Sequence, residues 1–125
     1  MIDDSFVFKI KSDFLRALGH PSRLRIIEHL KQGEKSVTQI GQKLDMEQSG
    51  LSKHLAILKQ AGIVHARQEK VTVYYSIRDQ DIYDVLIRIS SILKKRMRES
   101  EQIFSQLEKE EANGLKLIKN LKEPK

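Results

Sequence analysis

Residues 37–64 read VTQIGQKLDMEQSGLSKHLAILKQAGIV, and this stretch decides the fold. Apolar side chains recur every three to four residues over about 37–44 and again over about 48–60, which predicts two short amphipathic helices. Ser36 is placed to cap the first helix, and Gly62 ends the second. Only Asp45-Met46-Glu47 separates them, so a tight turn joins the two helices. The predicted core positions are Val37, Ile40 and Leu44 in the first helix and Leu51, Leu55 and Leu58 in the second.

Two more helices are predicted ahead of this stretch. Over about 5–18 an apolar residue recurs at every fourth position, and Gly19 ends this helix. Pro21 fits the first turn of the next helix, which runs toward Gly33. The apolar residues that recur in the first of these helices are Phe6, Ile10, Phe14 and Leu18, and the second helix is expected to carry Leu24, Ile27 and Leu30 inward.

A β-hairpin is predicted after Gly62. Ile63 and Val64 lead into its first strand, and residues 67–70 form a polar tip that carries Arg67 and Lys70. Residues 71–77 alternate and are rich in β-branched and aromatic side chains, as expected of the returning strand.

The C-terminal third predicts one long helix. Residues 79–112 contain no Gly or Pro, and an apolar stripe follows one side of them. At about 1.5 Å per residue this helix measures about 50 Å, which is too long for a small domain to cover. Asn113-Gly114 is expected to end the helix, so the domain spans 1–112 and residues 113–125 form a tail. The stripe consists of Ile82, Leu86, Ile89, Leu93, Met97, Phe104 and Leu107.

Composition narrows the classes of function. The chain has 125 residues, 39% of them apolar and 32% charged, which indicates one globular domain. It contains no cysteine, which excludes disulfides, thiolate metal sites and cysteine nucleophiles and fits a cytoplasmic protein. No apolar run approaches the roughly 20 residues that span a bilayer. The net charge is +6, and residues 48–78 hold five basic residues against one acidic residue, so an anionic partner is expected.

The two helices of the quoted stretch form a helix-turn-helix, whose second helix enters the major groove of DNA. Gln48 can bond adenine, Lys53 can bond guanine, and Ser49 or Ser52 can bond bases or phosphates. Arg67 and Lys70 at the hairpin tip are candidates for phosphate or minor-groove contacts. The fold class predicted is mainly α with a small β-hairpin (α+β): a winged helix-turn-helix with a long C-terminal dimerisation helix.

Three segments resemble the ArsR/SmtB family of repressors: ALGHPSRLRIIEHL (17–30), GLSKHLAILKQAGIV (50–64) and VYYSI (73–77). The resemblance covers about residues 12–93 and keeps the family's order of segments. It implies a dimeric repressor that binds double-stranded DNA through Gln48, Ser49, Ser52 and Lys53, with His54 adjacent. It also implies that the first helix and the long C-terminal helix build the homodimer. The interface residues expected from it are Phe6, Ile10, Phe14, Ile89, Leu93, Met97 and Phe104.

Metal-sensing members of this family carry ligands that this sequence lacks. Ser36 and Thr38 stand where a Cys-x-Cys pair is usual, and their neutral hydroxyls are poor ligands for soft metals. Asp79 and Asp81 match half of a second family site, but Ile92 and Lys95 replace the other half. We therefore expect no metal and no cofactor, and the sequence identifies no small-molecule effector.

Other interpretations stay open at this level. Gln48 to Lys53 can be a solvated helix face, His54 can pack against the turn, and the protein can be a winged-helix module that binds protein instead of DNA. An enzyme is not expected, because the chain lacks a Gly-rich phosphate loop and a nucleophile elbow. A membrane binder is not expected either, because the long helix has no Trp and mixed charges.

Overall fold

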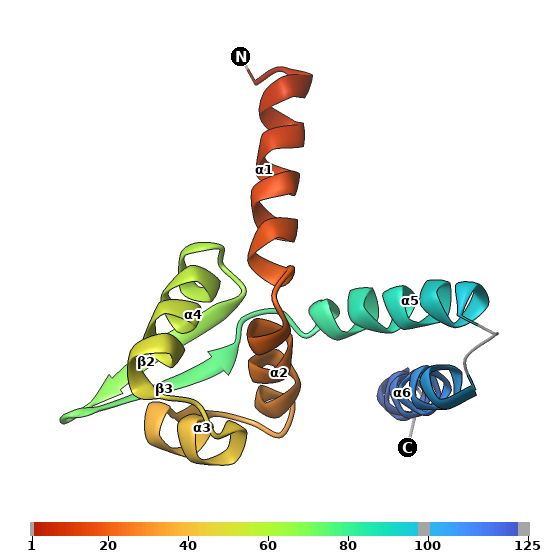
Figure 1. Cartoon of the computed structure of the whole chain (residues 1–125). Coiled ribbons are helices and arrows are strands. Elements are labelled where there is room, and N and C mark those ends of the chain that lie inside the picture. The colour runs from red at the N-terminus through yellow and green to blue at the C-terminus, as the bar shows by residue number, and fades with distance from the viewer. Residues whose placement is uncertain (1, 98–100, 123–125) are drawn as a thin grey trace. The chain divides into compact units, whose positions relative to one another are not determined.

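The computed structural model describes residues 2–97 and 101–122. Its chain divides into two units, residues 1–79 and residues 80–125. Unit 1 holds four helices and a small sheet, and unit 2 holds two helices (Figure 1).

Helix α1 (Asp4–Leu18) opens unit 1. The side chain of Asp3 caps it by accepting from the Phe6 amide at 3.0 Å, which satisfies one of the free N–H groups of the first turn. Figure 1 shows α1 extending away from the other elements of this unit. Only Ala17 and Leu18, at its C-terminal end, are buried. Phe14 is half-buried and the rest of the apolar face is exposed, which leaves that face available to another partner.

Helices α2 (Pro21–Leu30), α3 (Val37–Leu44) and α4 (Gln48–Gln60) form the core of unit 1. The predicted bounds of α3 and α4 are confirmed, and Ser36 and Gln39 form a capping box at the start of α3. The prediction for Leu24 was wrong, since its side chain is 38% exposed. Ile26 is buried in its place, because the inward side of α2 follows the three- and four-residue spacing of positions 23, 26, 27 and 30. The most deeply buried residues of unit 1 are Ile26, Ile27, Ile40, Leu51, Leu55, Leu58 and Val64.

The sheet has three antiparallel strands in the order β1-β3-β2: β1 (Lys35–Ser36), β2 (Val64–Glu69) and β3 (Thr72–Ile77). The hairpin was predicted, but β1 was not, because two residues carry no alternation signal. Arg67 is not at the tip as predicted. It lies within β2 opposite Tyr74, and the turn is made by Lys70 and Val71. We call the hairpin of residues 64–77 the wing.

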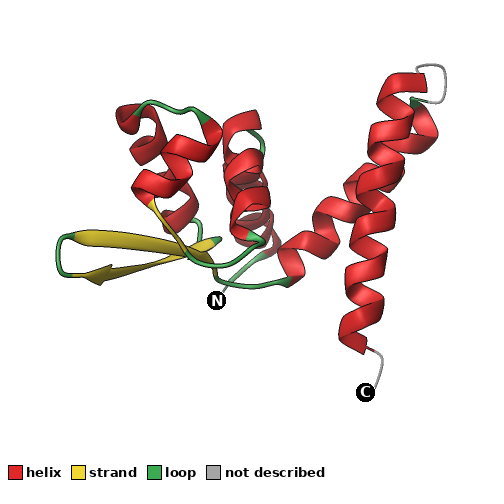
Figure 2. Ribbon diagram, turned by 90° about the horizontal axis from the view of Figure 1, so that it is seen from below, coloured by secondary structure: helices red, strands yellow, loops and turns green. Residues whose placement is uncertain are grey.

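Unit 2 corrects the prediction of one long helix. It consists of α5 (Asp81–Arg96) and α6 (Glu101–Lys122), which pack side by side (Figure 2). Asn113-Gly114 does not end a helix but lies inside α6, so residues up to 122 are not a tail. Gly114 is buried, and a side chain there would overlap Ile87 of α5. The missing side chain is what lets the two helices approach so closely.

Polar contacts fix how α5 and α6 face each other. Lys94 pairs with Glu111 at 2.6 Å, and the Ser90 hydroxyl donates to Glu110 at 3.3 Å. Phe104 lies seven residues before Glu111, about two turns away on the same side of α6, and it is half-buried. It therefore belongs to the face of α6 that packs on α5. Part of the predicted stripe is therefore covered within the chain itself.

Candidate nucleic-acid interface

Helix α4 presents one polar face to solvent. Gln48, Ser49, Ser52 and Lys53 are all exposed, while Leu51, Leu55 and Leu58 on the other side are buried. The 3–4-residue spacing of the four polar positions places them together over the first half of the helix. Across residues 2–97 and 101–122, none of the four side chains makes a hydrogen bond or an ion pair. The side chains predicted as base contacts thus lie on one exposed face and have no partner among the described residues.

The turn before α4 fixes the start of this face. Asp45 ends α3 in the left-handed conformation (φ 52°), and the Met46 amide donates to the Gly41 carbonyl at 3.0 Å. Arg25 of α2 donates to the Leu44 carbonyl at 3.0 Å, which ties the end of α3 to α2. Glu47 occupies the N-cap position of α4, but its side chain makes no capping bond. The first N–H groups of α4 therefore lack a side-chain acceptor and can receive an anion.

His54 does not belong to the exposed face. Its ring is half-buried on the flank of α4 that faces α2, where Nδ1 lies 3.2 Å from Nη1 of Arg23. The His20 ring lies beside it, with 4.4 Å between the centroids. Burial lowers the pKa of His54, and the nearby charges of His20 and Arg23 lower it further. A base contact by His54 stays a prediction, because its polar atom on this side is already in use.

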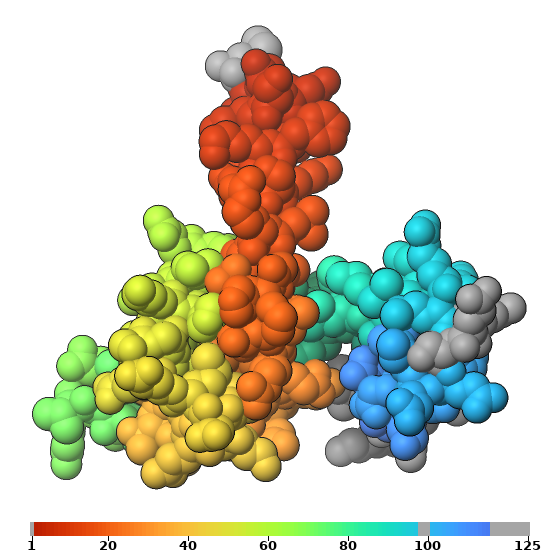
Figure 3. Space-filling view, viewed as in Figure 1, coloured from red at the N-terminus to blue at the C-terminus, as the bar shows by residue number. Residues whose placement is uncertain are grey.

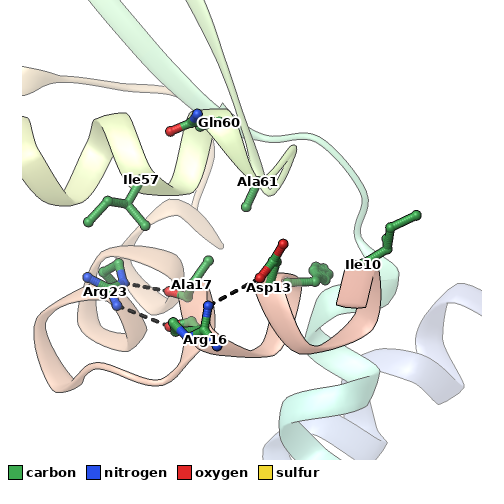
Figure 4. A pocket seen from close by; sticks show the side chains of 9 residues that line it. Ile10, Asp13, Arg16, Ala17, Arg23, Ile57, Gln60 and Ala61 are labelled. Atoms are coloured by element: carbon green, nitrogen blue, oxygen red, sulfur yellow. Dashed lines mark hydrogen bonds and ion pairs between the residues drawn. The ribbon is translucent and has the colours of Figure 1, made fainter. Parts of the chain in front are cut away.

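Arg23 is a residue that the sequence did not single out. It is 8% exposed and donates to the carbonyls of Ala17 and Arg16, the latter at 3.1 Å, at the end of α1 (Figure 4). It therefore joins α1, α2 and, through His54, α4. It also forms part of a groove of about 780 Å³, and Figure 4 shows how the side chains are arranged around it. The groove is lined by Ile10, Asp13, Phe14, Arg16, Ala17, Arg23, Ile57, Gln60 and Ala61.

The two basic residues predicted on the wing have different surroundings. Lys70 is exposed at the turn (φ 57°), on the hairpin that projects from unit 1 in Figure 3. Arg67 is bonded to two carboxylates, Glu34 and Glu69. These bonds raise the pKa of Arg67, and the bond from Arg67 lowers the pKa of Glu34. Lys70 is thus available to a phosphate, whereas Arg67 is already paired.

The residues predicted as a dimer interface fall in both units. Phe6 and Ile10 on α1 are 48% and 53% exposed, and Phe14 is half-buried. On α5, Ile89 and Leu93 are 40% and 39% exposed, and Met97 is half-buried. Each unit therefore carries an exposed apolar surface of the kind that interfaces use.

Among the described residues, no three His, Asp or Glu side chains come close enough together to hold a metal ion. No helix among these residues combines the length and the apolar character that crossing a membrane requires.

Helix α4, the turn before it and the wing define a winged helix-turn-helix protein, a class that binds DNA. Residues 20–66 match the arsR family of bacterial regulatory proteins. The uncharacterized HTH-type transcriptional regulator Rv0081 of Mycobacterium tuberculosis is 31% identical over 102 residues, which cover 81% of this chain and 90% of that protein. The chain belongs to the arsR family. It is a transcriptional regulator and not an enzyme.

Known structures and a named relative agree with this assignment. The crystal structure of Rv0081 covers 74% of this chain and 94% of its own, with a TM-score of 0.67 and 33% identity. The homodimeric winged helix-turn-helix domain Mb0332 of Mycobacterium bovis covers 80% and 94%, with a TM-score of 0.68 and 25% identity. The biofilm growth-associated repressor of Agrobacterium fabrum is 42% identical over 65 residues, 52% of this chain and 56% of that protein.

Proposed function

We propose that this protein is a dimeric, sequence-specific repressor that binds an inverted-repeat operator in the cytoplasm. The observation that carries the proposal is the exposed face of α4, where Gln48, Ser49, Ser52 and Lys53 have no partner among the described residues. What distinguishes these four side chains from an ordinary solvated helix face is their position on the second helix of a helix-turn-helix, the helix that enters the major groove. A protein-binding module, in turn, favours an apolar or acidic face.

The chemistry of this face fits base recognition in the major groove. The Gln48 amide can donate to N7 and accept from N6 of adenine, and the Lys53 ammonium can donate to O6 and N7 of guanine. Ser49 and Ser52 can bond bases or phosphates, and the first N–H groups of α4 can receive a phosphate. On the wing, Lys70 supplies a further phosphate contact.

The proposed dimer follows from the apolar surfaces on α1 and α5. Burying a large apolar side chain that would otherwise stay in water stabilises a protein by roughly 1.5–3 kcal/mol. A second copy of the chain can cover Phe6, Ile10 and Phe14 of α1 and Ile89, Leu93 and Met97 of α5. The relative Mb0332 is a homodimer, which supports this assembly. Twofold symmetry places two recognition helices about 34 Å apart, one turn of DNA.

Repression is proposed from the relative in Agrobacterium fabrum, which is named a repressor.

Selection of bound duplexes from a random pool tests the proposal as a whole, followed by a salt titration of the selected sequence. We expect an inverted repeat and a steep negative dependence of log K on log salt, because each phosphate contact contributes about −0.9 to the slope. A shallow slope with no enriched sequence would favour a protein-binding module instead.

A further inference from the structure

We propose that Glu34 and Glu69 form an acidic latch on Arg67 that withholds this arginine from DNA and limits the affinity of the wing. The inference rests on the proposed DNA-binding function and adds two residues that oppose it. Neither carboxylate was predicted to act in the site, and one of them lies outside the wing.

All three guanidinium nitrogens of Arg67 are engaged. Nε and Nη2 donate to the two oxygens of Glu34, at 3.1 and 2.7 Å, and Nη1 donates to Glu69 at 2.9 Å. The Glu34 pair is bidentate, the strongest arrangement between these two groups. The centroid of the Tyr74 ring lies 4.8 Å from the guanidinium carbon of Arg67. Arg67 is thus held flat on the wing by one aromatic ring and two carboxylates.

The charge balance of this cluster is unfavourable for DNA. One guanidinium between two carboxylates leaves a net charge of −1. Glu34 is ionised at neutral pH like any exposed carboxyl, and the hydrogen bond from Arg67 lowers its pKa further. The carboxylates of Glu34 and Glu69 therefore cancel the attraction that Arg67 would offer a phosphate, while Lys70 three residues away remains attractive.

DNA does not gain by taking Arg67 from its partners. Moving the guanidinium to a phosphate would replace two carboxylate partners with one phosphate. It would also leave Glu34 and Glu69 unpaired next to the DNA backbone. Exposed ion pairs of this kind are weak one by one, so the latch depends on this balance of charge rather than on the strength of either bond.

The alternative role for Arg67 is purely structural. Glu34 precedes β1 and Arg67 lies in β2, so the pair joins the two outer strands of the sheet. In that case, removing the carboxylates changes the stability of the wing but gives no new phosphate contact. The two roles therefore predict different salt dependences.

The experiment compares two variants on the selected operator. E34Q/E69Q removes both carboxylates and leaves Arg67 without an anionic partner, and E34Q/E69Q/R67Q removes all three charges. The matched control is E28Q. It removes the carboxylate of Glu28, which lies on α2 and forms a separate ion pair with Lys31. Binding is measured by fluorescence anisotropy over a range of salt concentrations, with circular dichroism spectra to check folding.

We expect E34Q/E69Q to steepen the salt slope by about 0.9 for each half-site relative to the triple variant. Between 1 M and 0.1 M salt, a slope difference of this size corresponds to about an eightfold gain in affinity for each half-site. The triple variant should match the slope of the wild type, and E28Q should leave the slope unchanged.

Equal slopes for the double and the triple variant would overturn the latch, because Arg67 would then reach no phosphate even when freed. A gain in DNA affinity by E28Q as large as that of E34Q/E69Q would also overturn the latch. Loss of any negative charge would then raise the affinity, wherever that charge lies. Failure of the proposed function is a separate outcome. The wild-type protein would then select no duplex at all.

Discussion

Nη1 of Arg23 lies 3.2 Å from Nδ1 of His54, and this contact joins α2 to the recognition helix α4. A guanidinium only donates hydrogen bonds, so Nδ1 of His54 must accept. That requirement holds the imidazole in its neutral form, with the ring proton on Nε2. The same arginine bonds the last carbonyls of α1, so three helices meet at one side chain.

Acidification should therefore destabilise unit 1 through His54. Its pKa is lowered in the folded state, so the unfolded chain takes up a proton first as the pH falls. The free energy of unfolding is expected to be highest above about pH 6.5 and to decrease as the pH falls through the lowered folded-state value. His54→Asn retains an acceptor for Arg23 and removes the titration.

Urea unfolding at about pH 7.5 and about pH 5.5 measures the effect. The His54→Asn protein should lose less stability between the two values than the wild type does. Some loss should remain, because burial also lowers the pKa of His29. An undiminished loss in His54→Asn would show that His54 does not titrate as described.

A side chain at Gly114 should be destabilising, because the Ile87 side chain would have to move. An added methyl group would overlap Ile87, so Gly114→Ala is expected to destabilise the pairing of α5 with α6 by about 1–3 kcal/mol, the usual cost of overpacking. Gly50→Ala is the matched control, because Gly50 is also helical and has open space around it. That variant should gain about 0.5–1 kcal/mol from helix propensity. Thermal unfolding measures the change in stability of each variant. A change of the same sign in both variants would contradict the close packing at Gly114.

Leu93 should be needed for the dimer. A charge on the exposed face of α5 cannot be buried against a second copy, so Leu93→Asp is expected to sediment as a monomer and to bind DNA weakly and without sequence preference. Leu24→Asp serves as control, since Leu24 is 38% exposed, close to the 39% of Leu93, and lies on α2. A Leu93→Asp protein that remains dimeric would exclude this face as the interface.

Local signals in the sequence predicted the helix-turn-helix correctly. Ser36, Asp45 and Gly62 mark helix ends through their own backbone chemistry, and the spacing of Leu51, Leu55 and Leu58 sets the buried face of α4. The exposed face with Lys53 follows directly from that burial. These features depend on residues that are close in the chain, so the sequence alone specifies them.

The features that the sequence missed depend on distant residues. Arg67 has a partner 33 positions away in Glu34, and no spacing rule links the two. Arg23 resembles a solvated helix residue, but the end of α1 supplies the carbonyls that allow its burial. Asn113-Gly114 has the composition of a helix end, yet close packing against Ile87 keeps Gly114 inside α6. In each case a tertiary contact overrides the local preference.

The most direct test of base recognition by α4 compares Lys53→Ala with Lys59→Ala on the selected operator and on a panel of single-base-pair variants. Both changes remove one exposed lysine from the same helix, so they share the general electrostatic effect. Lys53→Ala is expected to lose roughly 1–3 kcal/mol of discrimination at one base pair in each half-site. Lys59→Ala should weaken all duplexes alike and keep the preference. If Lys53→Ala preserves the full preference at every base pair, α4 does not recognise the operator through Lys53, and the central claim is contradicted.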